Sequence, residues 1–126
     1  MRKILILVVE DDPGLVDFLT ACLKCDGYTV EVACGGRLGC EKARSLKPDL
    51  VILDLLLPDM HGFDVCQNLR KEESLNGVKI LVSTAKAYPS DRRAALRLGA
   101  DGFLVKPYTS DQLLAAVKGL LGSPGQ

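Results

Sequence analysis

The sequence predicts a single α/β domain of the doubly wound kind, a five-stranded parallel sheet with helices on both faces. Short apolar runs of strand type alternate along the chain with amphipathic segments of helical length, five of each. Parallel strands need crossover connections, and helices that alternate with strands supply them. The length of 126 residues suits one domain. We expect residues 1–122 to form it and residues 123–126 to form a flexible tail.

The first strand and helix carry clear boundary signals. Ile4–Val9 is an uninterrupted apolar run that leads directly into acids. Pro13–Lys24 then places its apolar residues at helical spacing. Asp12 is the expected N-cap, because it precedes a proline at the first helical position. Gly27 is expected to end this helix.

The middle of the chain continues the alternation. Thr29–Ala33 is rich in β-branched residues and predicts a short strand, and Arg37–Leu46 predicts the second helix. The break Lys47-Pro48-Asp49 precedes Leu50–Leu53. This run of four apolar residues indicates a strand buried on both faces, and it ends at Asp54.

The second half of the chain predicts two strands and three helices, with Gly99 as a C-cap after the fourth helix. In chain order these elements are Phe63–Lys71, Ile80–Val82, Ser90–Leu98, Phe103–Val105 and Ser110–Leu121.

Composition excludes several classes of function. The chain is 48% hydrophobic and 25% charged, with a formal net charge of zero, so no overall field favours nucleic acid or an anionic membrane. No apolar stretch approaches the roughly 20 residues that a membrane span needs. Met1-Arg2-Lys3 leads into six apolar residues and then acids, which is typical of a strand and not of a signal peptide. We therefore expect a cytoplasmic protein that binds neither membrane nor nucleic acid directly.

The five cysteines and the single histidine predict no site of their own. An odd number of cysteines without secretory context favours reduced thiols over a disulfide framework. Cys22 and Cys25 form one Cys-x-x-Cys pair, but Cys22 holds an apolar helical position and no second pair completes a zinc site, so zinc or redox use is the weaker alternative. His61 falls in a turn and is expected to be a solvated loop residue.

Polar side chains follow four of the predicted strands. Glu10 and Asp11 follow the first strand, Asp54 the third, Thr84 the fourth and Lys106 the fifth. If the strands are parallel, these ends meet at one edge of the sheet, where open α/β sheets bind ligands.

The residue types at this edge indicate phosphoryl chemistry. Clustered carboxylates repel one another unless a cation neutralises them, and Mg²⁺ prefers such oxygen ligands. The Thr84 hydroxyl and the Lys106 ammonium suit a phosphoryl group. Taken singly, Asp12 could be only a helix cap, Glu10 a solvated acid, Thr84 a turn cap and Lys106 a surface lysine. Taken together, the four strand ends favour a site.

Five segments of the sequence resemble the receiver domains of two-component response regulators, and the resemblance spans essentially the whole chain. These segments are Val8–Asp12, Asp49–Gly62, Ser83–Ala85, Leu98–Asp101 and Lys106-Pro107. The resemblance implies the flavodoxin-like form of the doubly wound fold. It also implies a phosphoprotein that acts in phosphorelay signal transduction and is regulatory, not an enzyme.

The family's roles map onto matching residues of this chain. Asp54 would accept a phosphoryl group as 4-aspartylphosphate, with Mg²⁺ as cofactor. Asp11 and Asp54 would bind the ion directly, Glu10 through water, and Leu56 through its backbone carbonyl. Lys106 would pair with the phosphoryl oxygens, and a cis Lys106–Pro107 bond would hold it inward.

The resemblance also implies a switch and its partners. Thr84 would contact the phosphoryl group and couple it to Phe103. The phosphodonor would be a sensor histidine kinase or a histidine phosphotransfer protein. The surface from Ser90 to Leu121 would bind an output domain, a partner protein or a second copy of the chain. Leu56 and Lys86 would tune the lifetime of the phosphoryl group, and His61 departs from the small or acidic residue that the family more often has.

Three alternatives belong to other classes. A receiver-like interaction module that works without phosphorylation is disfavoured because Asp11, Asp54, Thr84 and Lys106 are all present. A phosphatase of the haloacid-dehalogenase type also forms an aspartyl phosphate, but it needs a second acid where Leu56 stands. A flavin or nucleotide binder would need a glycine-rich or hydroxyl-rich first turn in place of the acids.

Overall fold

The computed structural model describes residues 3–85 and 88–122 of the chain. Five strands form one sheet, and their bounds are β1 Leu5–Val9, β2 Thr29–Ala33, β3 Leu50–Asp54, β4 Lys79–Thr84 and β5 Gly102–Val105. The helices between and after them are α1 Pro13–Cys25, α2 Gly36–Leu46, α3 Gly62–Lys71, the 3₁₀ turn η1 Glu73–Leu75, α4 Pro89–Arg97 and α5 Ser110–Leu121.

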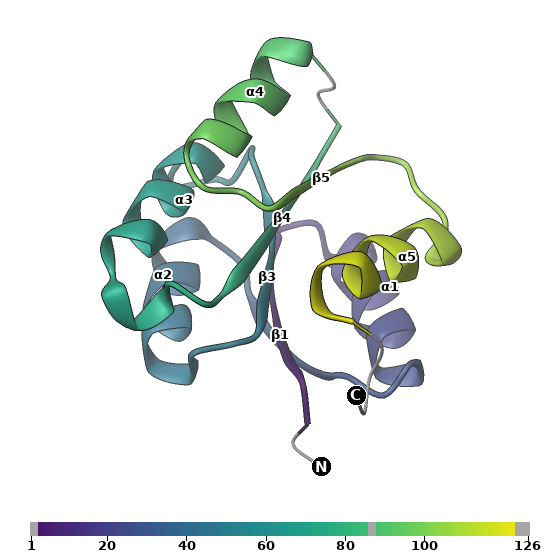
Figure 1. The fold of residues 1–126 in the computed structure, drawn as a ribbon. Helices are drawn as coiled ribbons and strands as arrows, with labels where there is room; N and C mark the ends of the chain where they lie inside the picture. Colours follow the sequence, from purple (N-terminus) through teal and green to yellow (C-terminus); the bar gives the residue numbers. More distant parts are fainter. Residues whose placement is uncertain (1–2, 86–87, 123–126) are drawn as a thin grey trace.

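The sheet is parallel throughout, with strand order β2-β1-β3-β4-β5. Helices α1 and α5 cover one face, and α2, α3 and α4 lie on the other (Figure 1). This is the predicted doubly wound fold with the flavodoxin-like strand order. The order reverses between β1 and β3, so their carboxyl ends flank the crevice in which such sheets bind ligands.

The core consists of two apolar layers, one on each face of the sheet. Side chains along β1 and β3 alternate between the layers, because successive residues of a strand point to opposite faces. Leu7, Val9, Val51 and Leu53 pack in the layer beneath α2 and α3, and Ile6, Val8, Leu50 and Ile52 pack in the layer beneath α1 and α5. All of these side chains are buried, as predicted for a strand covered on both faces.

Most predicted element boundaries agree with the structure to within two residues, and the differences have local causes. The structure also contains η1, a short turn that no hydrophobic periodicity in the sequence predicts. Strand β4 continues through Thr84, so the predicted strand end lies inside the strand. The Asp12 N-cap is confirmed, since its side chain accepts a hydrogen bond from the Gly14 amide at 3.1 Å.

The two glycines predicted at helix ends each follow the C-cap residue directly, so Gly27 ends α1 as predicted. Asp26 is the C-cap of α1, followed by Gly27 at φ 95°. Leu98 is the C-cap of α4, so the predicted C-cap role of Gly99 is wrong by one residue. Gly99 has φ 109°, a backbone conformation that favours glycine.

None of the helices in residues 3–85 and 88–122 is long and apolar enough to cross a membrane. The predicted tail, residues 123–126, lies outside the described residues.

Candidate functional site

The strand ends bring together the four polar groups predicted to form a site. Glu10 follows β1, Asp54 and Thr84 are the last residues of β3 and β4, and Lys106 follows β5. Strand register aligns these ends, because Asp54 lies beside Ser83 and Thr84 beside Val105. The predicted convergence at one sheet edge is therefore confirmed.

Glu10 is a buried carboxylate with three hydrogen-bond donors around it, and its side chain is only 3% exposed. Its Oε2 accepts from the backbone amides of Asp11 at 3.0 Å and Asp12 at 3.1 Å. Its Oε1 accepts from Lys106 Nζ at 2.8 Å. The alternative of a merely solvated acid is thus wrong, because the tight turn into α1 wraps two amides around the carboxylate.

Lys106 points into the site, which excludes the alternative of a surface lysine. Its ammonium lies 2.8 Å from Glu10 Oε1 and 3.5 Å from Asp54 Oδ1. Its backbone amide donates to the Thr84 carbonyl at 2.8 Å, which extends the β4–β5 pairing to the site. The predicted cis Lys106–Pro107 bond is confirmed.

Burial and charge act on both members of the Glu10–Lys106 pair. Burial raises the pKa of Glu10, and the nearby charge of Asp54 adds to it, although the hydrogen bond from Lys106 opposes both. For Lys106, burial lowers the pKa, but the Glu10 hydrogen bond and the charge of Asp54 outweigh that effect, so its pKa is raised. The charge of Asp54 thus raises both pKa values, and for Glu10 it adds to the larger effect of burial.

Glu10, Asp11 and Asp54 form a group that fits a divalent cation. One carboxylate oxygen from each lies within 4.8 Å of the others, and in the part of the chain that the structure describes this is the one such group. Among the described residues, Lys106 is the one cation paired with this group, and it contacts Glu10 and Asp54. Three carboxylates therefore share one ammonium, and the described cluster carries excess negative charge. Oxygen donors of this number and charge suit Mg²⁺, which keeps several waters.

The β3–α3 loop positions Asp54 and is closed on itself. The Gly62 amide donates to the Leu55 carbonyl at 2.7 Å, and Leu56 and His61 form an antiparallel bridge. A Cβ on Gly62 would lie 2.6 Å from the Asp54 carbonyl oxygen and 2.7 Å from Leu55 Cα, so a glycine is required there. The Leu56 amide lies 3.4 Å from Asp54 Oδ1, and the Leu56 side chain stays half exposed at the mouth of the site.

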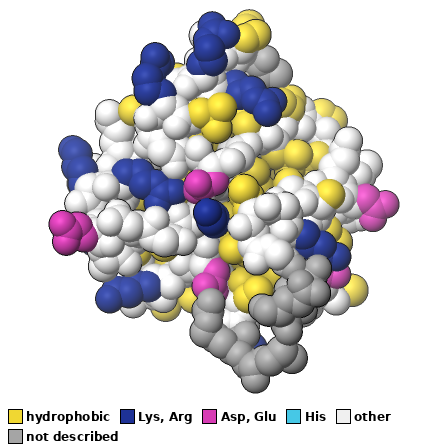
Figure 2. Space-filling model, in the orientation of Figure 1, with side chains coloured by type: hydrophobic (Ala, Val, Ile, Leu, Met, Phe, Trp, Pro, Cys, Tyr) yellow, Lys and Arg dark blue, Asp and Glu magenta, His cyan; other side chains and the backbone are white. Residues whose placement is uncertain are grey.

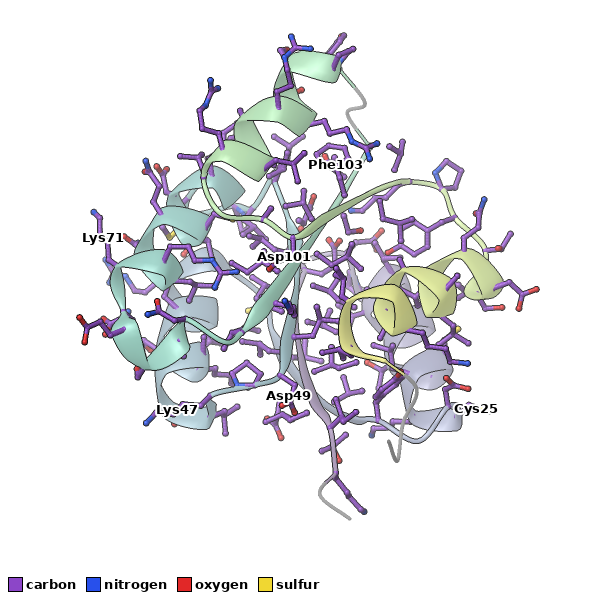
Figure 3. All side chains as sticks on the ribbon, viewed as in Figure 1. Cys25, Lys47, Asp49, Lys71, Asp101 and Phe103 are labelled. Atoms are coloured by element: carbon purple, nitrogen blue, oxygen red, sulfur yellow. The ribbon has the colours of Figure 1, made fainter. Side chains whose placement is uncertain are left out.

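Thr84 and Phe103 share one face of the sheet. Phe103 pairs with Val82, two residues before Thr84, and residues at this spacing point to the same side. Thr84 is fully buried, whereas Phe103 is partly exposed between β5 and α4 (Figure 3). Thr84 at the site and Phe103 beside α4 therefore lie on the same face of the sheet.

Sequence reasoning missed two further residues near the site. The Asp59 side chain accepts from the Gly36 and Arg37 amides at 2.8 and 3.0 Å, and so fastens the β3–α3 loop to the start of α2. The Tyr108 hydroxyl lies 3.0 Å from Ser83 Oγ. No local pattern announces the Asp59 contact, because its partners are more than twenty residues away in the chain.

The remaining predicted residues play no part in the assembled cluster. His61 is exposed as expected, but it also caps α3, because its Nδ1 accepts from the Phe63 amide at 3.0 Å. Lys86 lies outside the described residues. All five cysteines are free, and none belongs to the carboxylate group that fits a cation among the described residues.

Comparison with known proteins connects this geometry to a family. Residues 6–118 match the family model described as "Response regulator receiver domain". The DNA-binding dual master transcriptional regulator RpaA of Synechocystis sp. is 40% identical over 92% of this chain and 48% of its own length. The DNA-binding response regulator MtrA of Mycolicibacterium smegmatis is 42% identical over 92% of this chain and 50% of its own length. The chain thus spans about half the length of these curated relatives.

Solved structures show the same fold at 29% sequence identity. The Vibrio cholerae chemotaxis protein CheY4 superposes with a TM-score of 0.91 over 95% of this chain and all of its own. The receiver domain of a sensor histidine kinase from Pseudomonas aeruginosa superposes with a TM-score of 0.88 over 97% of this chain and all of its own. That structure holds a magnesium ion coordinated in its active-site cleft.

Proposed function

Because the chain belongs to the response regulator receiver domain family, we propose that it is a signalling switch controlled by phosphorylation of Asp54. The phosphodonor is a sensor histidine kinase or a histidine phosphotransfer protein. The observation that carries the proposal is the cluster of Glu10, Asp54 and Lys106, in which a partly buried lysine faces more carboxylates than it can neutralise.

The chain's own residues suit an in-line phosphoryl transfer. A carboxylate oxygen of Asp54 attacks the phosphorus, and the bond from phosphorus to the donor nitrogen breaks, which leaves an acyl phosphate on Asp54. Lys106 Nζ, already 3.5 Å from Asp54, pairs with a phosphoryl oxygen. Mg²⁺ held by Asp11 and Asp54, by Glu10 through water and by the Leu56 carbonyl would neutralise charge on the transferring group.

The added charge would then change the surface of the domain. Phosphoryl oxygens draw the Thr84 hydroxyl toward them, and Phe103 moves into the space that is vacated on the shared sheet face. The supporting geometry is the common orientation of the two side chains on β4 and β5. The surface from Ser90 to Leu121 would pass the signal to an output domain, a partner protein or a second copy.

The output acts through protein contacts in this proposal. The net charge of zero supplies no general attraction to nucleic acid, so the domain would regulate a DNA-binding output, such as those named in its relatives, without touching DNA itself.

Two competing functions have weaker support. An interaction module without phosphorylation would not need three carboxylates within 4.8 Å of one another, two of them paired with a partly buried lysine. An aspartyl-phosphate phosphatase would need an acid or amide near the phosphoryl group to activate water, and Leu56 presents an apolar side chain there. The protein is therefore proposed to be regulatory, with only its own phosphorylation and dephosphorylation assisted by the site.

The same absence of a polar group at Leu56 suggests a long-lived phosphoryl group. Leu56 cannot orient an attacking water, and we expect Lys86 to obstruct its approach. A Leu56→Asn, Lys86→Glu double variant should lose its phosphoryl group faster than wild type at matched Mg²⁺ and pH. Equal decay rates would mean that these two side chains do not set the lifetime.

The proposal is tested with a small phosphodonor. Wild-type protein incubated with acetyl phosphate and Mg²⁺ should gain one phosphoryl group, read by intact-mass spectrometry. Asp54→Asn should gain none at that rate, and removal of Mg²⁺ should suppress the reaction in wild type. An Asp59→Asn variant, which changes a nearby acid outside the cluster, is the matched control and should still be phosphorylated. Incorporation into Asp54→Asn at the wild-type rate would refute the assignment.

A further inference from the structure

The connection between β5 and α5 carries Lys106 and spans residues 106–109. Its two ends are fastened by the neighbouring secondary structure. The Lys106 amide continues the β4–β5 pairing, and Thr109 caps α5. Tyr108 lies between these ends, and its hydroxyl is 3.0 Å from Ser83 Oγ. This side-chain contact is a third attachment, which neither the strand pairing nor the helix cap requires.

Ser83 connects this attachment to the strand position beside the site. It pairs with Asp54 in the register between β3 and β4. Its side chain faces the opposite layer from Thr84, because successive residues of a strand point to opposite faces. Ser83 is only 1% exposed, so its hydroxyl needs a hydrogen-bond partner inside the protein. Tyr108 supplies that partner, and it thereby ties the segment that carries Lys106 to the residue next to Asp54.

The Tyr108 ring lies in the apolar layer beneath α1 and α5. Its centroid is 6.4 Å from that of the Phe18 ring. Figure 2 shows hydrophobic side chains between the β5–α5 connection and α5. A hydrogen bond is stronger in apolar surroundings than in water. Burial raises the pKa of Tyr108, so the phenol is neutral near neutral pH, and loss of its hydroxyl leaves the charge of the site unchanged.

The Lys106 ammonium has to move to serve a phosphoryl group on Asp54. Its Nζ lies 2.8 Å from Glu10 Oε1 but 3.5 Å from Asp54 Oδ1. Contacts with phosphoryl oxygens would therefore replace part of the contact with Glu10. Since lysine has a long flexible stem, its reach stays defined during this change when its backbone is held in place. The Glu10 ion pair cannot be that fixed point, whereas the attachments of residues 106–109 can.

We propose that Tyr108 is a positioning residue for phosphoryl transfer, whose hydroxyl, through Ser83, holds the Lys106 backbone so that the ammonium reaches the phosphoryl group. The Tyr108 hydroxyl itself does not contact the phosphoryl group. The role in transfer rests on the function proposed above. The attachment of the segment is a property of the fold, so it can be measured without a phosphodonor.

The first test compares maximal rates of phosphorylation at saturating Mg²⁺ and acetyl phosphate, a small donor that needs no docking surface. Tyr108→Phe keeps the ring and removes the hydroxyl, so it should slow the maximal rate about fivefold. Its Mg²⁺ affinity, read from ¹⁵N amide shifts, should match wild type because the carboxylates are unchanged. Tyr28→Phe is the matched control, since among the described residues the Tyr28 hydroxyl is buried without a hydrogen-bond partner. It should keep the wild-type rate.

A double-mutant cycle shows whether Tyr108 acts through Ser83. Ser83→Ala should slow the reaction about as much as Tyr108→Phe, and the double variant should be no slower than either single variant. Effects that multiply would contradict the route through Ser83. Rates are compared under conditions in which urea denaturation shows every variant to be folded. Tyr108→Phe that loses stability but keeps the wild-type rate would make the bond merely structural and overturn the proposal.

Hydrogen exchange separates this inference from the proposed function. The Lys106 amide donates to the Thr84 carbonyl, and Tyr108→Phe should accelerate its exchange about fivefold, whereas Tyr28→Phe should not. Unchanged exchange in Tyr108→Phe would mean that the hydroxyl does not hold Lys106, which also overturns the proposal. If wild type gains no phosphoryl group and the exchange is nevertheless accelerated, the proposed function fails while the attachment of Lys106 by Tyr108 is supported.

Discussion

Two clusters of charged side chains in this protein have similar contact distances, but only one of them is balanced in charge. At the carboxyl edge of the sheet, Lys106 contacts Glu10 at 2.8 Å and Asp54 at 3.5 Å, with Asp11 close by. Between α3 and the α4–β5 turn, Arg70 contacts Asp101 at 2.9 Å. The first cluster has more carboxylates than cations, whereas the second pairs one with one.

The Arg70 cluster has its hydrogen-bonding groups satisfied by the fold itself. Arg70 donates to the Gly99 carbonyl at 3.0 Å, to the Leu75 carbonyl at 3.2 Å and to Asp101. The Asp101 carboxylate also accepts from a β4 amide. The Arg70–Asp101 cluster therefore joins α3, η1, β4 and the turn after α4. The comparison teaches that a balanced cluster holds structure together, whereas an unbalanced one indicates a site that needs a cation from outside.

Removal of the Arg70 side chain should produce the largest loss of stability. Arg70→Ala removes the three hydrogen bonds that the guanidinium donates, to the Gly99 and Leu75 carbonyls and to Asp101. The Val78 and Ile80 amides still donate to Leu75 and Asp101, whereas the Gly99 carbonyl loses its donor. We therefore expect the free energy of unfolding to fall by about 3 kcal/mol. Urea denaturation measures the change. Lys71→Ala, at the exposed next position of the same helix, should stay within about 0.5 kcal/mol of wild type. Equal stability of the two variants would mean that the cluster is not structural.

The Cys66 thiol reports whether the Arg70 cluster opens. Burial raises the pKa of Cys66 to about 11, so near neutral pH the reactive thiolate is scarce. Iodoacetamide should therefore modify exposed Cys25 and Cys34 first and Cys66 much later, as followed by peptide mass spectrometry. Arg70→Ala should accelerate modification of Cys66, which lies one helical turn earlier. An unchanged Cys66 rate in that variant would separate the thiol from the cluster.

Asp59 provides a test with a smaller expected effect. It is an acid at the edge of the site, and two backbone amides donate hydrogen bonds to its carboxylate. The Arg37 and Gly36 amides lower the pKa of Asp59. A lowered folded-state pKa gives stability that is present above the unfolded value, about 3.9, and is lost as pH falls through the folded value. Wild type should therefore lose more stability in this acid range than Asp59→Asn. Identical pH profiles from urea denaturation would show that the hydrogen bonds from the Gly36 and Arg37 amides to Asp59 contribute nothing measurable.

Much of the fold and the acid cluster could be predicted because they follow local rules. Apolar runs in the sequence predicted β1 and β3. Parallel strands bring the residues at their carboxyl ends to one edge of the sheet. The contacts of Asp59 and of Arg70 could not be predicted, because they join segments 22 to 31 residues apart and depend on how helices pack. The burial of Glu10 had the same cause, since only the folded turn shows that two amides surround it.

The excess charge of the acid cluster is tested most directly by stability in the presence and absence of Mg²⁺. Urea denaturation of wild type and Asp54→Asn should be compared with chelator and with Mg²⁺ at a large excess over its Kd. Wild type should gain about 1 to 3 kcal/mol from Mg²⁺. With chelator, Asp54→Asn should be at least as stable as wild type, because one repelling carboxylate is gone, and its response to Mg²⁺ should be much smaller. A wild-type stability that does not change with Mg²⁺, together with a destabilised Asp54→Asn, would contradict the view that this cluster awaits a cation.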